Sequence, residues 1–328
     1  MTAQKKRTVL VTGGAGYIGS HVCKELHHQG YTPVTYDNMS KGHQWAVKWG
    51  PLVEGDLHDS KTLQQAFDTY QPIAVMHFAA SIEVGESVEA PIKYYRNNVG
   101  GSLNLLQIML ENNCKQIVFS STAATYGAPQ TELIDETHPQ NPINPYGASK
   151  LMVERIIRDC CLSDQLRFVF LRYFNACGAD SDVEIGESHT PETHLIPIVM
   201  QAAAGDREKL YIFGDDYHTP DGTCLRDYIH VEDLAAAHIL ALESLLSGAT
   251  SNEFNLGTGQ GYSVREIIQA AEKVVGHAIP YEVHAKRAGD PPVLVASSKK
   301  AEQQLNWSPQ KNLTEILTSA WRWYQKQT

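Results

Sequence analysis

The first half of the chain alternates short apolar runs with segments of helical periodicity. The apolar runs predict strands at residues 7–12, 33–36, 73–79, 116–120 and 168–173. Helical patterns lie between them, for example at 97–112, where the apolar side chains fall on one stripe. Strands that are apolar throughout and alternate with helices are typical of a parallel sheet covered on both faces. The pattern predicts an α/β fold with a Rossmann-type, doubly wound parallel sheet.

The second half is less regular, and Gly and Pro interrupt it. Helices are predicted at 231–246, 264–275 and 313–326, and residues 253–256 are expected to return as a strand to the first sheet. We therefore expect a first domain at residues 1–178, joined by parts of 231–260. A smaller C-terminal lobe is expected at 179–328.

Composition narrows the class of protein. The 328 residues are 42% hydrophobic and 20% charged, which is typical of a globular protein. The net charge of −10 argues against a nucleic-acid partner, which would need clustered Lys and Arg. No apolar run approaches the ~20 residues needed to cross a membrane. The polar start at 1–7 does not resemble a signal peptide, so we expect a cytoplasmic protein whose six cysteines are buried thiols.

A glycine pattern follows the first predicted strand. Gly13, Gly16 and Gly19 have the spacing G-x-x-G-x-x-G and precede a helix. Glycines at this spacing permit a tight turn, a close backbone approach to a pyrophosphate, and close packing of helix on strand. The phosphates would then lie at the helix N-terminus, where free N–H groups and the dipole favour negative charge. A simple turn with a packing glycine is the alternative.

An acidic residue at the next strand end points to the cofactor. Asp37 lies 18 residues after Gly19. A carboxylate there accepts hydrogen bonds from the adenine ribose and repels a 2′-phosphate, which predicts NAD rather than NADP. Asp56, after another short strand, is expected near the adenine. A surface Asp at the start of a turn is the alternative for Asp37.

Three further residues suggest proton chemistry. Tyr146 and Lys150 are four residues apart at the start of a helix and share one face. A nearby cation favours the phenolate and would make Tyr146 a base near neutral pH. Thr122, at the end of a strand, could complete a Thr–Tyr–Lys set at the carboxyl edge of the sheet. An amphipathic helix start with a solvated lysine is the alternative.

With these residues the chain resembles the extended short-chain dehydrogenase/reductase family over essentially its whole length. Further stretches that carry the resemblance are H-F-A-A (77–80), V-G-E-S (84–87), Y-Y-R-N-N-V (94–99), L-R-Y-F-N (171–175), I-F-G-D-D-Y-x-T-x-D-G-T (212–223), R-D-Y-I-H-V-x-D-L (226–234), N-L-G-T-G (255–259) and R-A-G-D (287–290). Within the family, the chain is most similar to the NAD-dependent epimerases that act on UDP-sugars.

The resemblance implies roles for individual residues. For NAD it implies Gly13, Gly16, Tyr17, Ile18, Gly19, Asp37, Asn38, Asp56, Leu57, Phe78, Ala79, Ala80, Asn97, Thr122, Tyr146, Lys150 and Phe174. For the UDP-sugar it implies Thr122, Tyr146, Asn175, His194, Leu195, Tyr211, Phe213, Arg226, Arg287, Asp290 and Leu294. The two arginines suit a pyrophosphate, which they can bond bidentately, although a surface ion pair is the alternative for either. Ile82 replaces a lysine that is frequent in the family, which leaves one cofactor contact in doubt.

The implied activity is the interconversion of UDP-galactose and UDP-glucose through a transient 4-keto sugar, with NAD retained. Tyr146, Lys150 and Thr122 are the catalytic residues in this hypothesis, and a homodimer through helices 97–112 and 148–161 is expected. Another UDP-sugar 4-epimerase, for N-acetylated sugars or pentoses, is the closest alternative. A dehydratase would need acids where Ala123 and Ala124 stand, and a non-catalytic dinucleotide-binding module would not need the Thr–Tyr–Lys set. The histidines and cysteines match no metal-binding motif, so no metal is expected.

Overall fold

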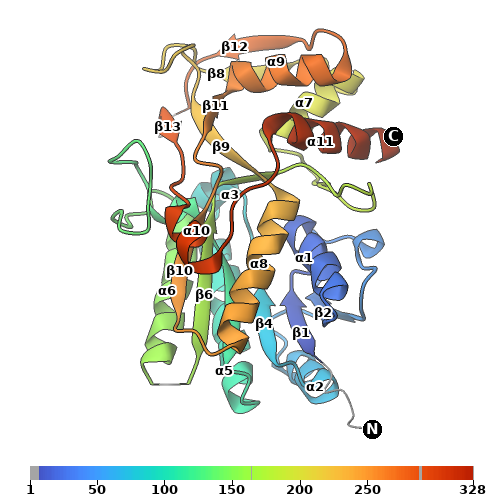
Figure 1. The fold of residues 1–328 in the computed structure, drawn as a ribbon, viewed down its shortest axis with the longest axis vertical. Helices are drawn as coiled ribbons and strands as arrows, with labels where there is room; N and C mark the ends of the chain where they lie inside the picture. The colour runs from blue at the N-terminus through green and yellow to red at the C-terminus, as the bar shows by residue number, and fades with distance from the viewer. Residues whose placement is uncertain (1–6, 164, 288–289, 328) are drawn as a thin grey trace. The chain divides into compact units, whose positions relative to one another are not determined.

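The computed structural model describes residues 7–163, 165–287 and 290–327. Within them, seven strands form one sheet in the order β10-β6-β5-β4-β1-β2-β3 (Figure 1). Their bounds are β1 Thr8–Thr12, β2 Thr32–Asp37, β3 Leu52–Glu54, β4 Ala74–His77, β5 Gln116–Thr122, β6 Arg167–Tyr173 and β10 Asn252–Leu256. β1 pairs in parallel with β2 on one side and β4 on the other. This point, where the strand order reverses, is where such sheets bind ligands. The predicted fold class is confirmed, and so is the return of 253–256 to the first sheet.

Helices cover both faces of this sheet. The main ones are α1 Tyr17–His28, α2 Ser60–Tyr70, α5 Gly101–Glu111, α6 Pro145–Leu162 and α8 Val231–Leu246. Side chains from alternate strand positions, such as Leu10, Val75 and Phe119, share one buried cluster with residues of α2, α5 and α6. Figure 1 shows α1 and α8 on the opposite face of the sheet. Shorter elements are η1 Gln44–Ala46, α3 Val84–Glu89, α4 Pro91–Tyr94, the π-helical turn η2 Tyr95–Gly100 and η3 Ala123–Thr125.

The chain divides into two compact units. Unit 1 comprises Met1–Ala128, Pro139–Arg172 and Ala235–Phe254, and unit 2 comprises Pro129–His138, Tyr173–Leu234 and Asn255–Thr328. The helices of unit 2 are α7 Leu195–Ala204, α9 Val264–Val275, α10 Lys299–Leu305 and α11 Leu313–Gln327. Its strands are β7 Asn175–Cys177, β8 Leu210–Phe213, β9 Leu225–His230, β11 Gly261–Ser263, β12 Tyr281–His284 and β13 Val293–Leu294. Ile196, Leu210, Ile267 and Ile316 belong to its own buried core.

Two expectations from composition can be compared with the structure. None of the helices in the described part of the chain could cross a membrane. The six cysteines are free thiols, but the expectation that all are buried is wrong. The buried ones are Cys23, Cys114 and Cys177, whereas Cys160, Cys161 and Cys224 are partly exposed. Cys160 lines an open depression beside α5, which explains its exposure.

Candidate active site

The candidate cofactor residues of unit 1 gather at one edge of the sheet. Gly13 follows β1, Asp37 ends β2, Phe78 follows β4 and Thr122 ends β5. The paired strands run parallel, so their carboxyl ends meet at the same edge. This is the edge at which open α/β sheets bind nucleotides.

The glycine loop has the geometry that its spacing predicts. Gly13 adopts a φ of 74°, and a Cβ there would lie 2.6 Å from the backbone nitrogen of Ala79. A Cβ on Gly19 would lie 2.2 Å from the carbonyl oxygen of Gly13, so only glycine allows α1 to pack this close. Gly16 is the N-cap of α1, so no side chain caps this helix. Its first turn begins with Tyr17 and Ile18 and contains no acidic residue. Such a helix start suits a phosphate group.

Asp37 is held rigidly at the end of β2. Its two carboxylate oxygens accept the backbone N–H groups of Ala15, at 3.0 Å, and of Met39, at 2.9 Å. Burial raises the pKa of Asp37 above its usual value, and these two hydrogen bonds offset only part of that rise. Each oxygen keeps a further lone pair, so the carboxylate can still accept ribose hydroxyls.

Asn38 and Asp56 are brought together beside Asp37. The amide nitrogen Nδ2 of Asn38 donates to Oδ2 of Asp56 at 2.7 Å, and Leu57 behind them is buried. Burial raises the pKa of Asp56, but hydrogen bonds from His58 and Asn38 bring it below its usual value. The pair therefore presents the Asn38 amide together with the Asp56 carboxylate, which stays ionised at neutral pH.

The loop after β4 carries the next predicted residues. The N–H groups of Phe78 and Ala79 both donate to the carbonyl of Thr12, which ties this loop to the glycine loop, and Ala80 follows. The ring of Phe78 lies 4.8 Å from that of His238 on α8. Ile82, in the place of the family's lysine, is 43% exposed and has no polar atom in its side chain.

Asn97 lies in the π-helical turn η2, and its neighbour Asn98 was missed by the sequence analysis. Asn98 is buried, accepts the N–H of Ser81 at 2.8 Å, and donates to the hydroxyl of Ser149 at 3.0 Å. It thereby connects the loop after β4 to α6. Asn97 donates to Asn98 at 3.0 Å. π-helical turns are frequent at functional sites, but single-sequence patterns do not reveal them.

Thr122, Tyr146 and Lys150 come together as predicted from their spacing. Asn144 caps α6 by accepting the N–H of Gly147 at 2.8 Å, so Tyr146 stands in the first turn and Lys150 one turn later. The hydroxyl of Thr122 lies close enough to the phenol of Tyr146 to lower its pKa. The Lys150 ammonium donates to the carbonyl of Ser120 at 2.9 Å.

The ionisation of these two side chains differs from the sequence expectation. Burial raises the pKa of Tyr146, and the nearby Thr122 hydroxyl lowers it, for a net upward shift. Burial also lowers the pKa of Lys150 to about 7, against the opposing effect of the Glu154 carboxylate. The expected lowering of the Tyr146 pKa is wrong for this structure, because desolvation exceeds the stabilisation of the phenolate.

A buried ionic network lies next to Thr122 and joins β5 and β6 to α6. Arg172 donates from Nε and Nη2 to the two oxygens of Glu154, at 2.8 and 2.7 Å, and from Nη1 to the hydroxyl of Tyr126 at 2.9 Å. Ser121, next to Thr122, donates to Glu154 at 2.6 Å. Burial raises the pKa of Glu154, but Arg172 brings it below its usual value. The network fixes the end of β5 against α6, and no local pattern in the sequence indicates it.

In unit 2, the predicted arginines have different partners. Arg226 on β9 forms an ion pair with Asp290 at 3.1 Å and donates to the carbonyl of Pro291 at 2.9 Å. Leu294 on β13 is its register partner and is partly exposed. Arg287 lies over the ring of Phe213 at 3.8 Å. Residues 288–289 of the R-A-G-D stretch lie outside the described residues.

The remaining predicted residues of unit 2 are dispersed over several elements. Tyr211, two residues before Phe213 on β8, is 38% exposed. Phe174 is buried, and Asn175 donates to the carbonyl of Asp227 at 2.8 Å. His194 caps α7 and Leu195 begins it.

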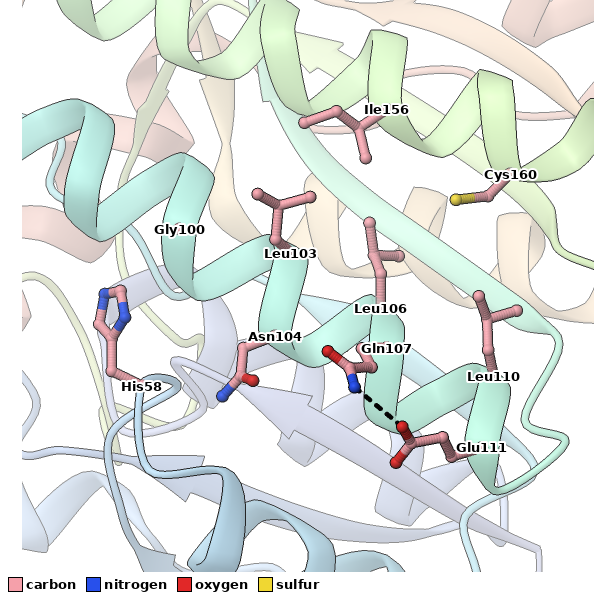
Figure 2. A pocket seen from close by; sticks show the side chains of 10 residues that line it. All are labelled: His58, Gly100, Leu103, Asn104, Leu106, Gln107, Leu110, Glu111, Ile156 and Cys160. Atoms are coloured by element: carbon pink, nitrogen blue, oxygen red, sulfur yellow. Dashed lines mark hydrogen bonds between the residues drawn. The ribbon is translucent and has the colours of Figure 1, made fainter.

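A depression of about 570 Å³ lies elsewhere in unit 1, along α5 and α6 (Figure 2). Leu103, Leu106 and Leu110 point into it from α5, and Ile156 and Cys160 from α6. Its lining includes none of the predicted catalytic residues, so we do not assign the chemistry to it. It follows the two helices on which the sequence analysis expects a dimer contact.

Comparison with known proteins identifies the family of this chain. The model of the NAD dependent epimerase/dehydratase family matches residues 9–257. A UDP-glucose 4-epimerase from Rhizobium leguminosarum bv. trifolii is 52% identical over 97% of this chain and 98% of its own. A crystal structure of UDP-glucose 4-epimerase from Brucella ovis in complex with NAD is 52% identical, covers 97% of this chain and 98% of its own, and has a TM-score of 0.95.

A second structure extends the comparison to a nucleotide. The UDP-glucose 4-epimerase from Bifidobacterium longum, in complex with NAD+ and UDP, is 40% identical, covers 97% of this chain and 98% of its own, and has a TM-score of 0.92. The predictions of an enzyme of this family and of NAD as its cofactor are confirmed. The chain belongs to the NAD dependent epimerase/dehydratase family.

Proposed function

We propose that this chain is a UDP-glucose 4-epimerase, which interconverts UDP-galactose and UDP-glucose through a transient 4-keto sugar. The observation that carries the proposal is the proximity of the Thr122 hydroxyl to the Tyr146 phenol, with Lys150 one helical turn away, at the edge of the sheet that holds the glycine loop. The names of the relatives support the same activity. Ala123 and Ala124 follow Thr122 in η3 and cannot transfer a proton, which disfavours a dehydratase.

The residues of unit 1 fit NAD. The uncapped start of α1 and its close-packed glycines suit the pyrophosphate, Asp37 suits the adenine ribose, and the Asn38–Asp56 pair suits the adenine. Phe78, Ala79, Ala80, Asn97 and Lys150 are proposed for the nicotinamide side, and so is Phe174, which belongs to unit 2. The chemistry that NAD supplies when bound is the reversible acceptance of a hydride from C4 of the sugar.

Asp37 makes this assignment testable. Its carboxylate would repel a 2′-phosphate, so NAD should restore activity to the emptied protein and NADP should not. Asp37→Asn should narrow the difference between the two cofactors. Equal restoration by NADP in the unaltered protein would contradict the role of Asp37.

Tyr146 is proposed as the base that takes the proton from the 4-hydroxyl of the sugar and returns it after the hydride has moved back. The Thr122 hydroxyl, close to the phenol, is proposed to orient it. Lys150, one turn further along α6, is proposed to stabilise the phenolate electrostatically once it forms.

Unit 2 is proposed to bind the UDP-sugar. Arg226 and Arg287 suit the pyrophosphate, and Tyr211 and Phe213 suit the uracil. Asn175, His194, Leu195, Asp290 and Leu294 complete the proposed set. The exposure of Tyr211, and the position of Arg287 over the Phe213 ring, are consistent with a ligand approaching this surface. Unit 1 then serves as the NAD-binding domain.

A homodimer and a cytoplasmic location are also part of the proposal. Leu103, which lines the depression of Figure 2, is 50% exposed, and Met152 on α6 is 45% exposed. A second copy of the same helices would cover these side chains. A monomer by light scattering at micromolar concentration would contradict the dimer.

The direct test of function is conversion of UDP-galactose by the purified chain. We expect UDP-glucose to form, with no added cofactor, until the two sugars reach equilibrium, because the reaction causes no net redox change. Release of a dehydrated sugar would indicate a dehydratase. Absence of turnover, with NAD bound, would indicate a binding module.

A further inference from the structure

Four potential metal ligands meet in the segment between β7 and α7 of unit 2. They are Glu187, His189, Glu192 and His194, and one ligand atom from each lies within 4.8 Å of the others. The sequence analysis missed this cluster, because the spacing E-x-H-x-x-E-x-H matches none of the metal motifs considered there. It also placed His194 with the sugar nucleotide alone.

The distances suit a small tetrahedral cation. Nδ1 of His189 lies 3.3 Å from Oε1 of Glu187 and 3.7 Å from Oε2 of Glu192, and Nδ1 of His194 lies 3.6 Å from Oε1 of Glu192. Zinc bonds of about 2.0–2.1 Å place tetrahedral ligands about 3.3 Å apart. The fourth separation, 2.6 Å from His194 Nδ1 to Glu187 Oε1, is a hydrogen bond, and a cation between these atoms would widen it.

The burial of the cluster calls for a positive charge. The side chains of Glu187 and Glu192 are each only 5% exposed, so these carboxylates need a positive charge beside them. The two imidazoles supply it when they are protonated, and a bound cation would supply it in their place. Nδ1 of His189 is buried, and it has no hydrogen-bond partner of good geometry among the described residues. It faces the two carboxylates, as a metal ligand would.

Neighbouring contacts hold these groups in position. The carbonyl of Glu187 accepts the indole N–H of Trp323 at 2.9 Å. Oε1 of Glu192 accepts the N–H groups of Thr193 and His194, at 2.8 and 2.9 Å. The Trp323 side chain thus holds the backbone at Glu187, and two backbone N–H groups hold the Glu192 carboxylate.

We propose that Glu187, His189, Glu192 and His194 form a structural site for Zn²⁺. Two imidazole nitrogens with two carboxylate oxygens suit zinc, whereas Mg²⁺ and Ca²⁺ prefer oxygen ligands alone. The ion neutralises the two carboxylates and fixes the segment that leads into α7. Because His194 binds through Nδ1, its Nε2 remains on the opposite side of the ring.

The test uses the full chain, freed of metal by a chelator and then titrated with Zn²⁺ alone in a calorimeter. We expect one Zn²⁺ per chain and no saturable binding of Mg²⁺ under the same conditions. His189→Gln and Glu192→Gln should each weaken Zn²⁺ binding about tenfold or more. Changes to the groups that only surround a metal site already cost about 10–100-fold in affinity. Co²⁺ in place of Zn²⁺ should give the visible absorption of a tetrahedral complex.

The matched control is His284→Gln. His284 lies 3.2 Å from Glu282 on the exposed strand β12, so this variant removes a His–Glu pair outside the cluster and should keep full affinity. Lack of Zn²⁺ binding, or equal binding by the cluster variants and the unaltered chain, would overturn the proposal. Circular dichroism verifies that each variant folds. If His189→Gln unfolds, the Zn²⁺ affinity of Glu192→Gln, a nearly isosteric change, tests the proposal instead. None of these readouts depends on epimerase activity.

Discussion

One ion pair from each unit shows two different ways of holding charged groups. In unit 1, the side chains of Arg172 and Glu154 are 2% and 0% exposed, and they satisfy each other with two hydrogen bonds. In unit 2, those of Arg226 and Asp290 are 13% and 33% exposed. The first pair fixes β5 and α6, which carry the proposed base, whereas the second stays accessible to a ligand. Buried ion pairs thus position the chemistry here, and accessible ones remain available to bind substrate.

The largest expected effect is on Tyr146. Tyr146→Phe removes only the ionisable hydroxyl, so the chain should fold and hold NAD but lose about 10²–10⁴-fold in kcat. Conversion of UDP-galactose and the NAD content of the purified protein are the measurements. Tyr70→Phe, in α2 and outside the site, is the control and should keep full activity. Near-normal turnover of Tyr146→Phe would exclude it as the base.

The contrast between the two ion pairs predicts unequal stability losses. Glu154→Gln leaves the Arg172 guanidinium buried without its counter-charge and should lower the free energy of unfolding by about 3–5 kcal/mol. Asp290→Asn, at the more exposed pair, should lower it by less than about 1 kcal/mol. Urea unfolding measures both. Similar losses in the two variants would show that burial does not distinguish the pairs.

Acid should destabilise unit 1 through His77. Its Nδ1 lies 2.7 Å from Thr12 and its Nε2 lies 2.8 Å from Ser102, and Ser102 donates its own hydrogen to the carbonyl of Asn98. The imidazole therefore carries a proton on Nε2, which it donates to Ser102. Burial lowers the pKa of His77 to about 3, and nearby Lys150 adds to this shift.

The sign of the pH effect follows from that pKa. The unfolded chain protonates His77 near its usual pKa of about 6.5, whereas the folded chain does not until about pH 3. The contribution of His77 to stability is complete above pH 6.5 and is lost, by about 1.4 kcal/mol per pH unit, as the pH falls towards 3. His77→Asn should flatten this slope, and exposed His218→Asn should not. Parallel pH profiles for His77→Asn and the unaltered chain would contradict the assignment.

Some features of the fold and of the site can be predicted from the sequence, and others cannot. The sheet, its helices, the glycine loop and the one-turn spacing of Tyr146 and Lys150 depend on local periodicity or on neighbours in the chain, so pattern alone located them. The Glu154–Arg172 ion pair and the hydrogen bonds of Asn98 join residues that are distant in sequence. Their burial depends on tertiary packing, which a single sequence does not display. The pKa of Tyr146 was misjudged for the same reason, since desolvation depends on the complete surroundings.

The smallest expected effect concerns the range of sugars. Leu294 pairs in register with Arg226 and is partly exposed, so its side chain is a candidate boundary of the sugar pocket. We expect efficient epimerisation of UDP-galactose and weaker, measurable activity on UDP-N-acetylgalactosamine. Apolar pockets discriminate such steric changes by only about 1–3 kcal/mol. Leu294→Tyr should reduce kcat/KM for the N-acetylated sugar and spare the plain sugar, because the larger ring fills the space that an acetamido group needs. Ile143→Tyr, at an exposed position in unit 1, is the control and should alter neither. Equal losses on both sugars, or none, would mean that Leu294 is not the boundary and packs within unit 2.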